Sequence, residues 1–184
     1  MALDPREHPR EHWAAMQRRY GAAQVTEWCA DLITGRIATR ADHPAVDMLS
    51  TGSHIQRIRS GVSPDYWVRA WAARALLYVW EDDAAPAVVT GLSDQHWRVR
   101  ELCAKVCRVR DLGAAADRLA VLVTDQTPRV RVAAIKALAQ VGEAEHADAV
   151  RAALDDPDPA VVGAAEIALP AMSERLDRDL GGPT

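Results

Sequence analysis

The chain repeats itself every 31 residues over most of its length. Four valines are evenly spaced, and each opens a nine-residue segment of similar character. The valines are Val68, Val99, Val130 and Val161, and their segments read VRAWAARAL, VRELCAKVC, VRVAAIKAL and VVGAAEIAL. A constant period of this length is typical of stacked units, each too small to bury its own apolar face. The period therefore predicts a repeat architecture, and it leaves the reaction and the ligand open.

The apolar spacing inside each repeat predicts two helices. In the second helix, apolar residues recur at offsets 0, 3, 4, 7 and 8 from the valine, which places them on one buried face. The sets are Val99, Leu102, Cys103, Val106 and Cys107; Val130, Ala133, Ala134, Ala137 and Leu138; and Val161, Ala164, Ala165, Ala168 and Leu169. The first helix carries an apolar pair four residues apart, in turn Val88 with Leu92, Leu119 with Val123, and Val150 with Leu154. We therefore expect an all-α fold, an α-solenoid of stacked helix pairs.

The segments before and after the repeats are expected to cap them, so that the chain forms one continuous domain. Residues 1–52 predict a divergent N-terminal helical cap with helices near 10–20, 24–34 and 44–51. Residues 53–171 carry the repeats, with a capping-box pattern at Ser53 and Gln56. Residues 172–184 predict a C-terminal helix at 172–180 and a tail, with a stop at Gly181-Gly182-Pro183.

Composition narrows the class of protein. No stretch of about 18 apolar residues exists, and the charged N-terminus lacks the apolar core of a secretory signal. The three cysteines have no disulfide-scaffold spacing, so we expect a protein of the reducing cytoplasm. Charge is uneven: residues 57–110 hold nine Lys/Arg and six Asp/Glu, whereas residues 111–184 hold seven and thirteen. This asymmetry could orient a partner or only keep the surface solvated.

These motifs resemble HEAT-like repeats, of the short variety first associated with phycobilisome lyases. That family's unit has an Asp near the turn and a Val-Arg pair opening the second helix. The segment from Asp125 to Arg131 fits closely, Asp94 with Val99-Arg100 fits well, and the last repeat has Val162 where Arg is usual. The resemblance covers about residues 53–169 and implies two antiparallel helices per unit. It is specific for fold and poor for function, because this fold serves scaffolds, adaptors, lyases and DNA-repair proteins.

One set of charged residues follows the period and is expected to be structural. In the family, such Asp and Arg side chains typically hydrogen-bond between neighbouring repeats. An Asp–Arg bond is geometrically specific and could set the repeat spacing. This structural ladder comprises Asp94, Asp125, Asp156, Arg69, Arg100 and Arg131.

A second series of cations is the candidate partner-binding stripe. Arg74, Lys105 and Lys136 lie six residues after each valine, away from the buried stripe, and Arg108 is one turn beyond Lys105. If second helices line a concave surface, as the resemblance implies, these side chains form a basic stripe along a groove. Such a stripe would suit an acidic protein segment or a phosphate backbone, or it is simply a solvated helix face. Trp97, beside Arg98, could anchor a peptide or stack on a base, or pack between repeats.

The sequence contains no motif for catalysis or cofactor binding. It has no P-loop, GxSxG, HExxH or dinucleotide fingerprint, so neither a catalytic residue nor a cofactor is predicted. No metal site is predicted either: Cys103 and Cys107 occupy core positions, and His8 with His12 belong to a charged N-terminus.

Three functions therefore compete. The first is a non-enzymatic protein–protein interaction scaffold or adaptor that binds an acidic partner segment in its groove. The alternative is a nucleic-acid-binding protein resembling the HEAT-like DNA alkylation-repair glycosylases, suggested by the basic middle and its tryptophans. A lyase or chaperone for a bound tetrapyrrole follows from the family association alone. The sequence predicts no membrane partner and leaves the oligomeric state open.

Overall fold

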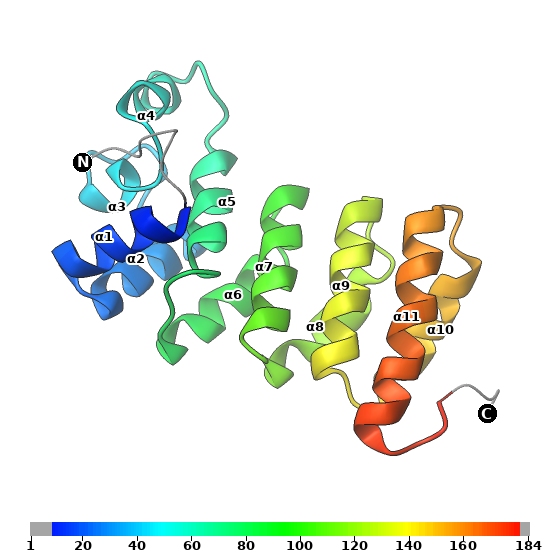
Figure 1. The fold of residues 1–184 in the computed structure, drawn as a ribbon. Coiled ribbons are helices and arrows are strands. Elements are labelled where there is room, and N and C mark those ends of the chain that lie inside the picture. Colours follow the sequence, from blue (N-terminus) through cyan, green and yellow to red (C-terminus); the bar gives the residue numbers. More distant parts are fainter. Residues whose placement is uncertain (1–8, 181–184) are drawn as a thin grey trace. The chain divides into compact units, whose positions relative to one another are not determined.

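Helices begin at 31-residue intervals along the chain. The second helices of successive repeats start at Tyr66, Trp97, Pro128 and Pro159, and short 3-10 turns precede the first helices at Asp82, Gly113 and Ala144. The structure, a computed structural model, describes residues 9–180. Within them every regular element is a helix, so the all-α prediction and the stacked helix pairs are confirmed (Figure 1).

The chain divides into two compact units, Met1–Gly91 and Leu92–Thr184. Unit 1 consists of α1 (Pro9–Tyr20), α2 (Ala22–Thr34), α3 (Pro44–Asp47), α4 (Gly52–Arg59), α5 (Tyr66–Ala75), η1 (Asp82–Ala84) and α6 (Ala85–Gly91). Unit 2 consists of α7 (Trp97–Val109), η2 (Gly113–Ala115), α8 (Ala116–Leu122), α9 (Pro128–Val141), η3 (Ala144–His146), α10 (Ala147–Ala152), η4 (Ala153–Asp155) and α11 (Pro159–Leu176). The division between the units falls at the end of α6, inside one predicted repeat.

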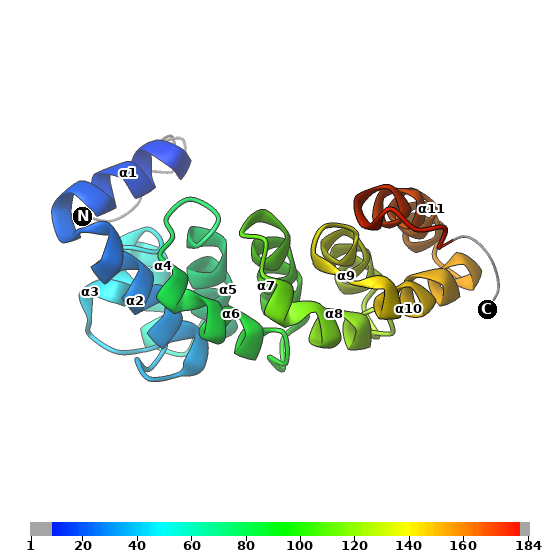
Figure 2. The same ribbon diagram turned by 90° about the horizontal axis from the view of Figure 1, so that it is seen from below.

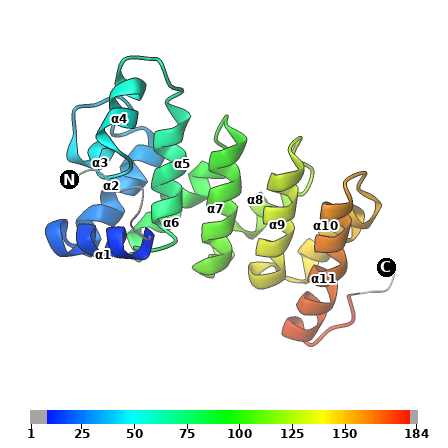
Figure 3. The same cartoon turned by 45° about the horizontal axis from the view of Figure 1, so that its top comes forward.

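Helix α2 is the centre of unit 1. It packs against α1, α3, α5 and α6 (Figure 3). Its Val25, Cys29 and Leu32 side chains are fully buried. His12 of α1 is also buried, and its Nε2 donates a hydrogen bond to the Met48 carbonyl oxygen over 2.8 Å. Because a buried imidazole needs a partner, this bond explains why a polar side chain lies in this core.

Unit 2 has two layers of helices. Helix α9 packs against both α7 and α11 in one layer, and α8 and α10 form the other layer (Figure 2). The predicted buried stripes lie between these layers, and Leu102 is their only partly exposed member. Among the apolar pairs of the first helices, Leu154 alone is partly exposed. The many alanines in the stripes have small side chains, which lets neighbouring helices approach closely.

Several local predictions differ from the structure. The cap of α4 is Thr51, whose Oγ1 accepts the His54 N–H, and Ser53 is already inside that helix. Helix α3 ends at Asp47, before the predicted 51. Trp71 lies three residues after Val68, at a position of the buried stripe, but it is only partly buried; its ring stacks on that of Trp67, with ring centroids 5.7 Å apart.

The C-terminus differs as well. Instead of a separate helix at 172–180, α11 continues through Pro170 to Leu176. Pro170 removes the hydrogen bond to Glu166, and because both residues are exposed, water can satisfy the freed carbonyl. Asp177 ends the helix with a φ of 50°, and the predicted stop at Gly181-Gly182-Pro183 lies outside the described residues.

Candidate interaction groove in unit 2

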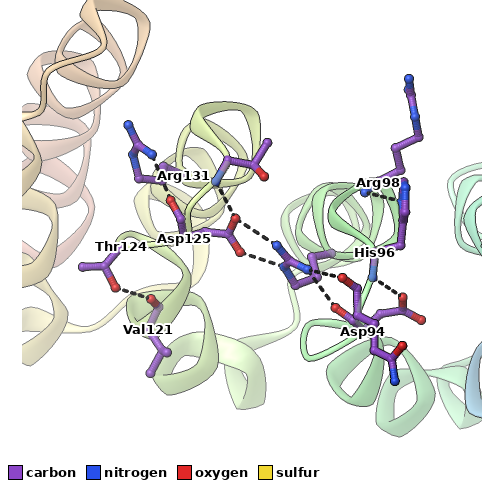
Figure 4. A network of polar contacts seen from close by, with 10 residues as sticks. Asp94, His96, Arg98, Val121, Thr124, Asp125 and Arg131 are labelled. Atoms are coloured by element: carbon purple, nitrogen blue, oxygen red, sulfur yellow. Dashed lines mark hydrogen bonds and ion pairs between the residues drawn. The ribbon is translucent and has the colours of Figure 1, made fainter.

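Arginine–aspartate pairs join neighbouring repeats of unit 2. Arg100 of α7 donates from Nε and Nη2 to the two carboxylate oxygens of Asp125, over 2.7 and 3.0 Å. Arg131 of α9 donates from Nη2 to Asp156 over 2.6 Å. Both arginines also donate from Nη1 to backbone carbonyls of their own repeat, at Asp94 and Asp125, over 2.9 Å (Figure 4). Each arginine therefore ties two consecutive inter-helix turns together.

The aspartates also shape the turns in which they lie. Oδ1 of Asp125 accepts the Thr127 N–H over 2.8 Å, and Oδ1 of Asp156 accepts the Asp158 N–H over the same distance. Asp94 does the same for His96 over 2.7 Å (Figure 4). A side-chain acceptor at this spacing mimics a backbone turn and directs the chain into the next helix. Arg69, the remaining predicted member of the ladder, lies on α5 of unit 1.

Hydrogen bonding to arginine alters the titration of one aspartate. The bond from Arg131 lowers the pKa of Asp156 below its ordinary value, and the Asp158 N–H lowers this pKa further. The same bond raises the pKa of Arg131. Both side chains are about nine-tenths buried, so water screens this pair little.

The first hollow of unit 2 lies between α7, α9 and the start of α11. It has a volume of about 360 Å³. Its lining residues are Glu101, Lys105, Arg108, Pro128, Arg129, Val132, Ala133, Lys136, Asp158 and Ala160. Three members of the predicted basic stripe, Lys105, Arg108 and Lys136, therefore meet at one site. We call it the charged hollow.

Glu101 organises one side of the charged hollow, and the sequence analysis missed it. Its Oε1 accepts hydrogen bonds from Lys105 Nζ over 2.8 Å and from Arg129 Nη2 over 3.1 Å. The Glu101 side chain is only 8% exposed, so it requires these cations, and they are held in place. The four-residue spacing of Glu101 and Lys105 on one helix face was the signal available in the sequence.

Trp97 lies against arginines. The Arg98 guanidinium carbon is 4.4 Å from the centroid of the Trp97 ring, and that of Arg129 is 5.5 Å from it. Trp97 and Arg98 are both partly exposed. Through Arg129, this cation–π cluster adjoins the charged hollow.

A second hollow adjoins the first. It has a volume of about 290 Å³ and is lined by Arg108, Lys136, Ala139, Gln140, Ala164, Ile167, Ala168 and Ala171. Five of these eight side chains are aliphatic, so we call it the apolar hollow. Arg108 and Lys136 line both hollows and thus form their common edge.

Arg74, the third cation of the predicted series, lies on α5 of unit 1, where it is exposed. It lines neither the charged hollow nor the apolar hollow. The site is therefore defined by α7, α9 and α11 alone.

Other residues weighed from the sequence do not form a site in residues 9–180. No group of three or more His, Cys, Asp or Glu in this range could hold a metal ion. Cys103 and Cys107 are buried free thiols, and burial raises the pKa of Cys107 to about 12. His8 lies outside the described residues. No helix in the described range is long and apolar enough to cross a membrane.

Comparison with known proteins supports the repeat architecture. Residues 115–179 match a family model for HEAT repeats. No curated protein matches the chain. A solved structure of the complex of CpcE and CpcF of phycocyanin lyase from Nostoc sp. PCC7120 contains a similar chain, with a TM-score of 0.56 and 21% identity. The likeness covers 93% of this chain and 67% of that one. At this identity the likeness concerns the fold, and it agrees with the HEAT repeats matched at residues 115–179.

Proposed function

We propose that this protein is a non-enzymatic protein–protein interaction scaffold or adaptor, which binds an acidic segment of a partner in the groove of unit 2. The observation that carries the proposal is the pair Arg108 and Lys136. Both side chains are exposed, and neither makes a hydrogen bond or ion pair with another described residue. Lys105 and Arg129, by contrast, are already held by Glu101. An acidic partner would thus meet two uncompensated cations beside two preordered ones.

The fold supports a binding role. HEAT repeats expose an extended helical surface without requiring a catalytic centre. The similar solved structure is itself a complex of two different subunits, which is consistent with a partner protein here. The cations lie on second helices, and α7, α9 and α11 form one continuous layer on which a segment could lie (Figure 2).

The nucleic-acid alternative has less support. A base could stack on Trp97 only if a ring face were available, and two guanidinium groups already lie at that ring. The part of the chain that contains the groove's α9 and α11, residues 111–184, is also net acidic. Such a chain would repel a phosphate backbone outside the groove.

Charge reversal tests the proposal. The variant Arg108→Glu/Lys136→Glu removes both free cations from the groove. The control Arg118→Glu/Arg178→Glu changes the net charge equally, at exposed residues of unit 2 that line neither hollow. Each form is used to capture proteins from a lysate of the source organism, with and without nuclease treatment, and recovery is quantified by mass spectrometry.

We expect a partner that the wild type and the control retain and that the groove variant loses, with unchanged far-UV circular dichroism. Equal recovery by both variants would remove the groove from the proposal. Recovery that disappears on nuclease treatment in all forms would favour the nucleic-acid alternative.

A further inference from the structure

The cation series of the repeats ends on an isoleucine. Lys105 and Lys136 are 31 residues apart, and the equivalent position one repeat later is Ile167 on α11. This side chain is 74% exposed, although it is large and aliphatic. The last repeat therefore replaces an ammonium group with an apolar surface at the same place on the stack.

The surroundings of Ile167 continue this apolar surface. Ala139, Ala164, Ala168 and Ala171 line the same hollow, and their short side chains leave its volume of about 290 Å³ open. The only cations on its lining are Arg108 and Lys136, whose long methylene stems can also cover apolar groups. The apolar hollow could hold an aliphatic side chain of a partner. It has no carboxylate on its lining that could pair with a basic side chain.

The two hollows together specify a composite ligand. Since Arg108 and Lys136 form their common edge, a carboxylate bound between these cations would lie directly beside the apolar hollow. We infer that the partner segment combines an acidic residue with a nearby aliphatic residue, such as Leu, Ile, Val or Met, and that the aliphatic side chain packs on Ile167. This inference rests on the proposed function and specifies which kind of acidic segment the groove binds.

The ionic contact and the apolar contact are expected to contribute differently to the affinity. The cations attract the segment and orient it, but exposed charge pairs contribute little affinity because water screens them. Burial of an aliphatic side chain against Ile167 removes apolar surface from water and supplies the larger share. A segment with acidic residues alone is therefore expected to bind weakly.

Peptide selection tests the inference. Random dodecapeptides displayed on phage are selected on the full-length protein. A selected peptide, its Glu→Gln form and its aliphatic→Ser form are then titrated by fluorescence anisotropy against the wild type, Ile167→Ser and Val121→Ser. Val121 is a matched control, because it is 71% exposed, lies on α8 of the same unit and lines neither hollow.

We expect selected peptides to contain both residue types at a constant spacing. Ile167→Ser should lower the affinity for the selected peptide about tenfold. It should not change the affinity for the aliphatic→Ser peptide, because the two side chains are expected to contact each other. Val121→Ser should match the wild type. Ile167→Lys, which restores the cation of the other repeats, should instead favour peptides with a second acidic residue.

The outcomes separate this inference from the proposed function. Peptides enriched in acidic residues alone, with no effect of Ile167→Ser, would overturn the inference and leave the acidic groove standing. Peptides without acidic enrichment, and insensitive to Arg108→Glu/Lys136→Glu, would overturn both. Dimerisation of the wild type in sedimentation experiments, lost in Ile167→Ser, would overturn the inference by identifying a second copy as the occupant.

Discussion

Arg100 binds both carboxylate oxygens of Asp125, although the two residues are 25 positions apart in the chain. The Arg100 side chain is 9% exposed and that of Asp125 is 6% exposed, so the ion pair is shielded from water. The same arginine donates to carbonyl oxygens at Asp94 and Gln95. One side chain thus links the turn of its own repeat to the turn of the next.

Asp125→Ala should strongly destabilise unit 2. The change leaves a buried guanidinium without its carboxylate, and breaking a buried pair in this way costs about 3–5 kcal/mol. Urea unfolding followed by circular dichroism measures the effect. Asp148→Ala is the control, since Asp148 pairs with Arg151 at the surface with 75% of its side chain exposed, and its loss should cost about 0–1 kcal/mol. Equal effects of the two substitutions would contradict a role of Arg100–Asp125 in holding the repeats together.

Acid should weaken the protein partly through Asp156. The bond from Arg131 lowers the pKa of Asp156 below its ordinary value of 3.8 in the folded state. The pair therefore stabilises the fold fully above pH 3.8, and this contribution is lost as the pH falls through the lowered pKa. We expect Asp156→Asn to be less stable than the wild type at pH 6 and to approach it near pH 2. The measurement is the free energy of unfolding of both forms across this range, and a constant difference would exclude the linkage.

The cysteines should be unreactive in the native protein. All three are buried, and burial raises the pKa of each thiol, that of Cys107 to about 12. At pH 8 the reactive thiolate is therefore scarce as well as inaccessible. Reaction with Ellman's reagent should be slow in buffer and should reach three thiols per chain in 8 M urea. Rapid native labelling of any one cysteine would show that its surroundings open more readily than the structure implies.

Two glycines of unit 2 should respond oppositely to alanine. At Gly142, after α9, a Cβ atom would lie 2.7 Å from the Leu138 carbonyl oxygen, which is closer than real Cβ contacts. We expect Gly142→Ala to cost about 1–3 kcal/mol through the backbone shift it requires. At Gly163, inside α11, a Cβ meets nothing within 4 Å, so Gly163→Ala should stabilise the helix by about 1 kcal/mol. Thermal melting of both variants checks the signs, and destabilisation by Gly163→Ala would mean that its neighbours are closer than described.

The repeat period was sufficient to predict helix pairs, the buried stripes and the surface positions of the cations. Helix periodicity alone determines which residues share a face, so Lys105 and Lys136 could be placed away from the core without coordinates. The same period placed an arginine and an aspartate at matching positions of successive repeats. Sequence signals of this kind are local, and they recur because every repeat solves the same packing problem.

Local sequence signals were less reliable for the positions at which helices begin and end. Thr51 and Ser53 both suit the start of α4, and the structure uses Thr51. The sequence predicted a separate helix at 172–180, but α11 continues through Pro170 because the affected carbonyl can be hydrated. In both cases the preference of a single residue was not sufficient to locate the end of a helix.

The candidate site required the tertiary structure. By itself the sequence determined the architecture, the buried faces and the exposure of Lys136. Only the stacking of α7, α9 and α11 showed that Glu101 binds Arg129, 28 residues away, and that Arg108 and Lys136 form the edge shared by the two hollows. The physical reason is that helix periodicity specifies which way a side chain points, whereas contacts between repeats depend on the distance and rotation with which one helix packs on the next.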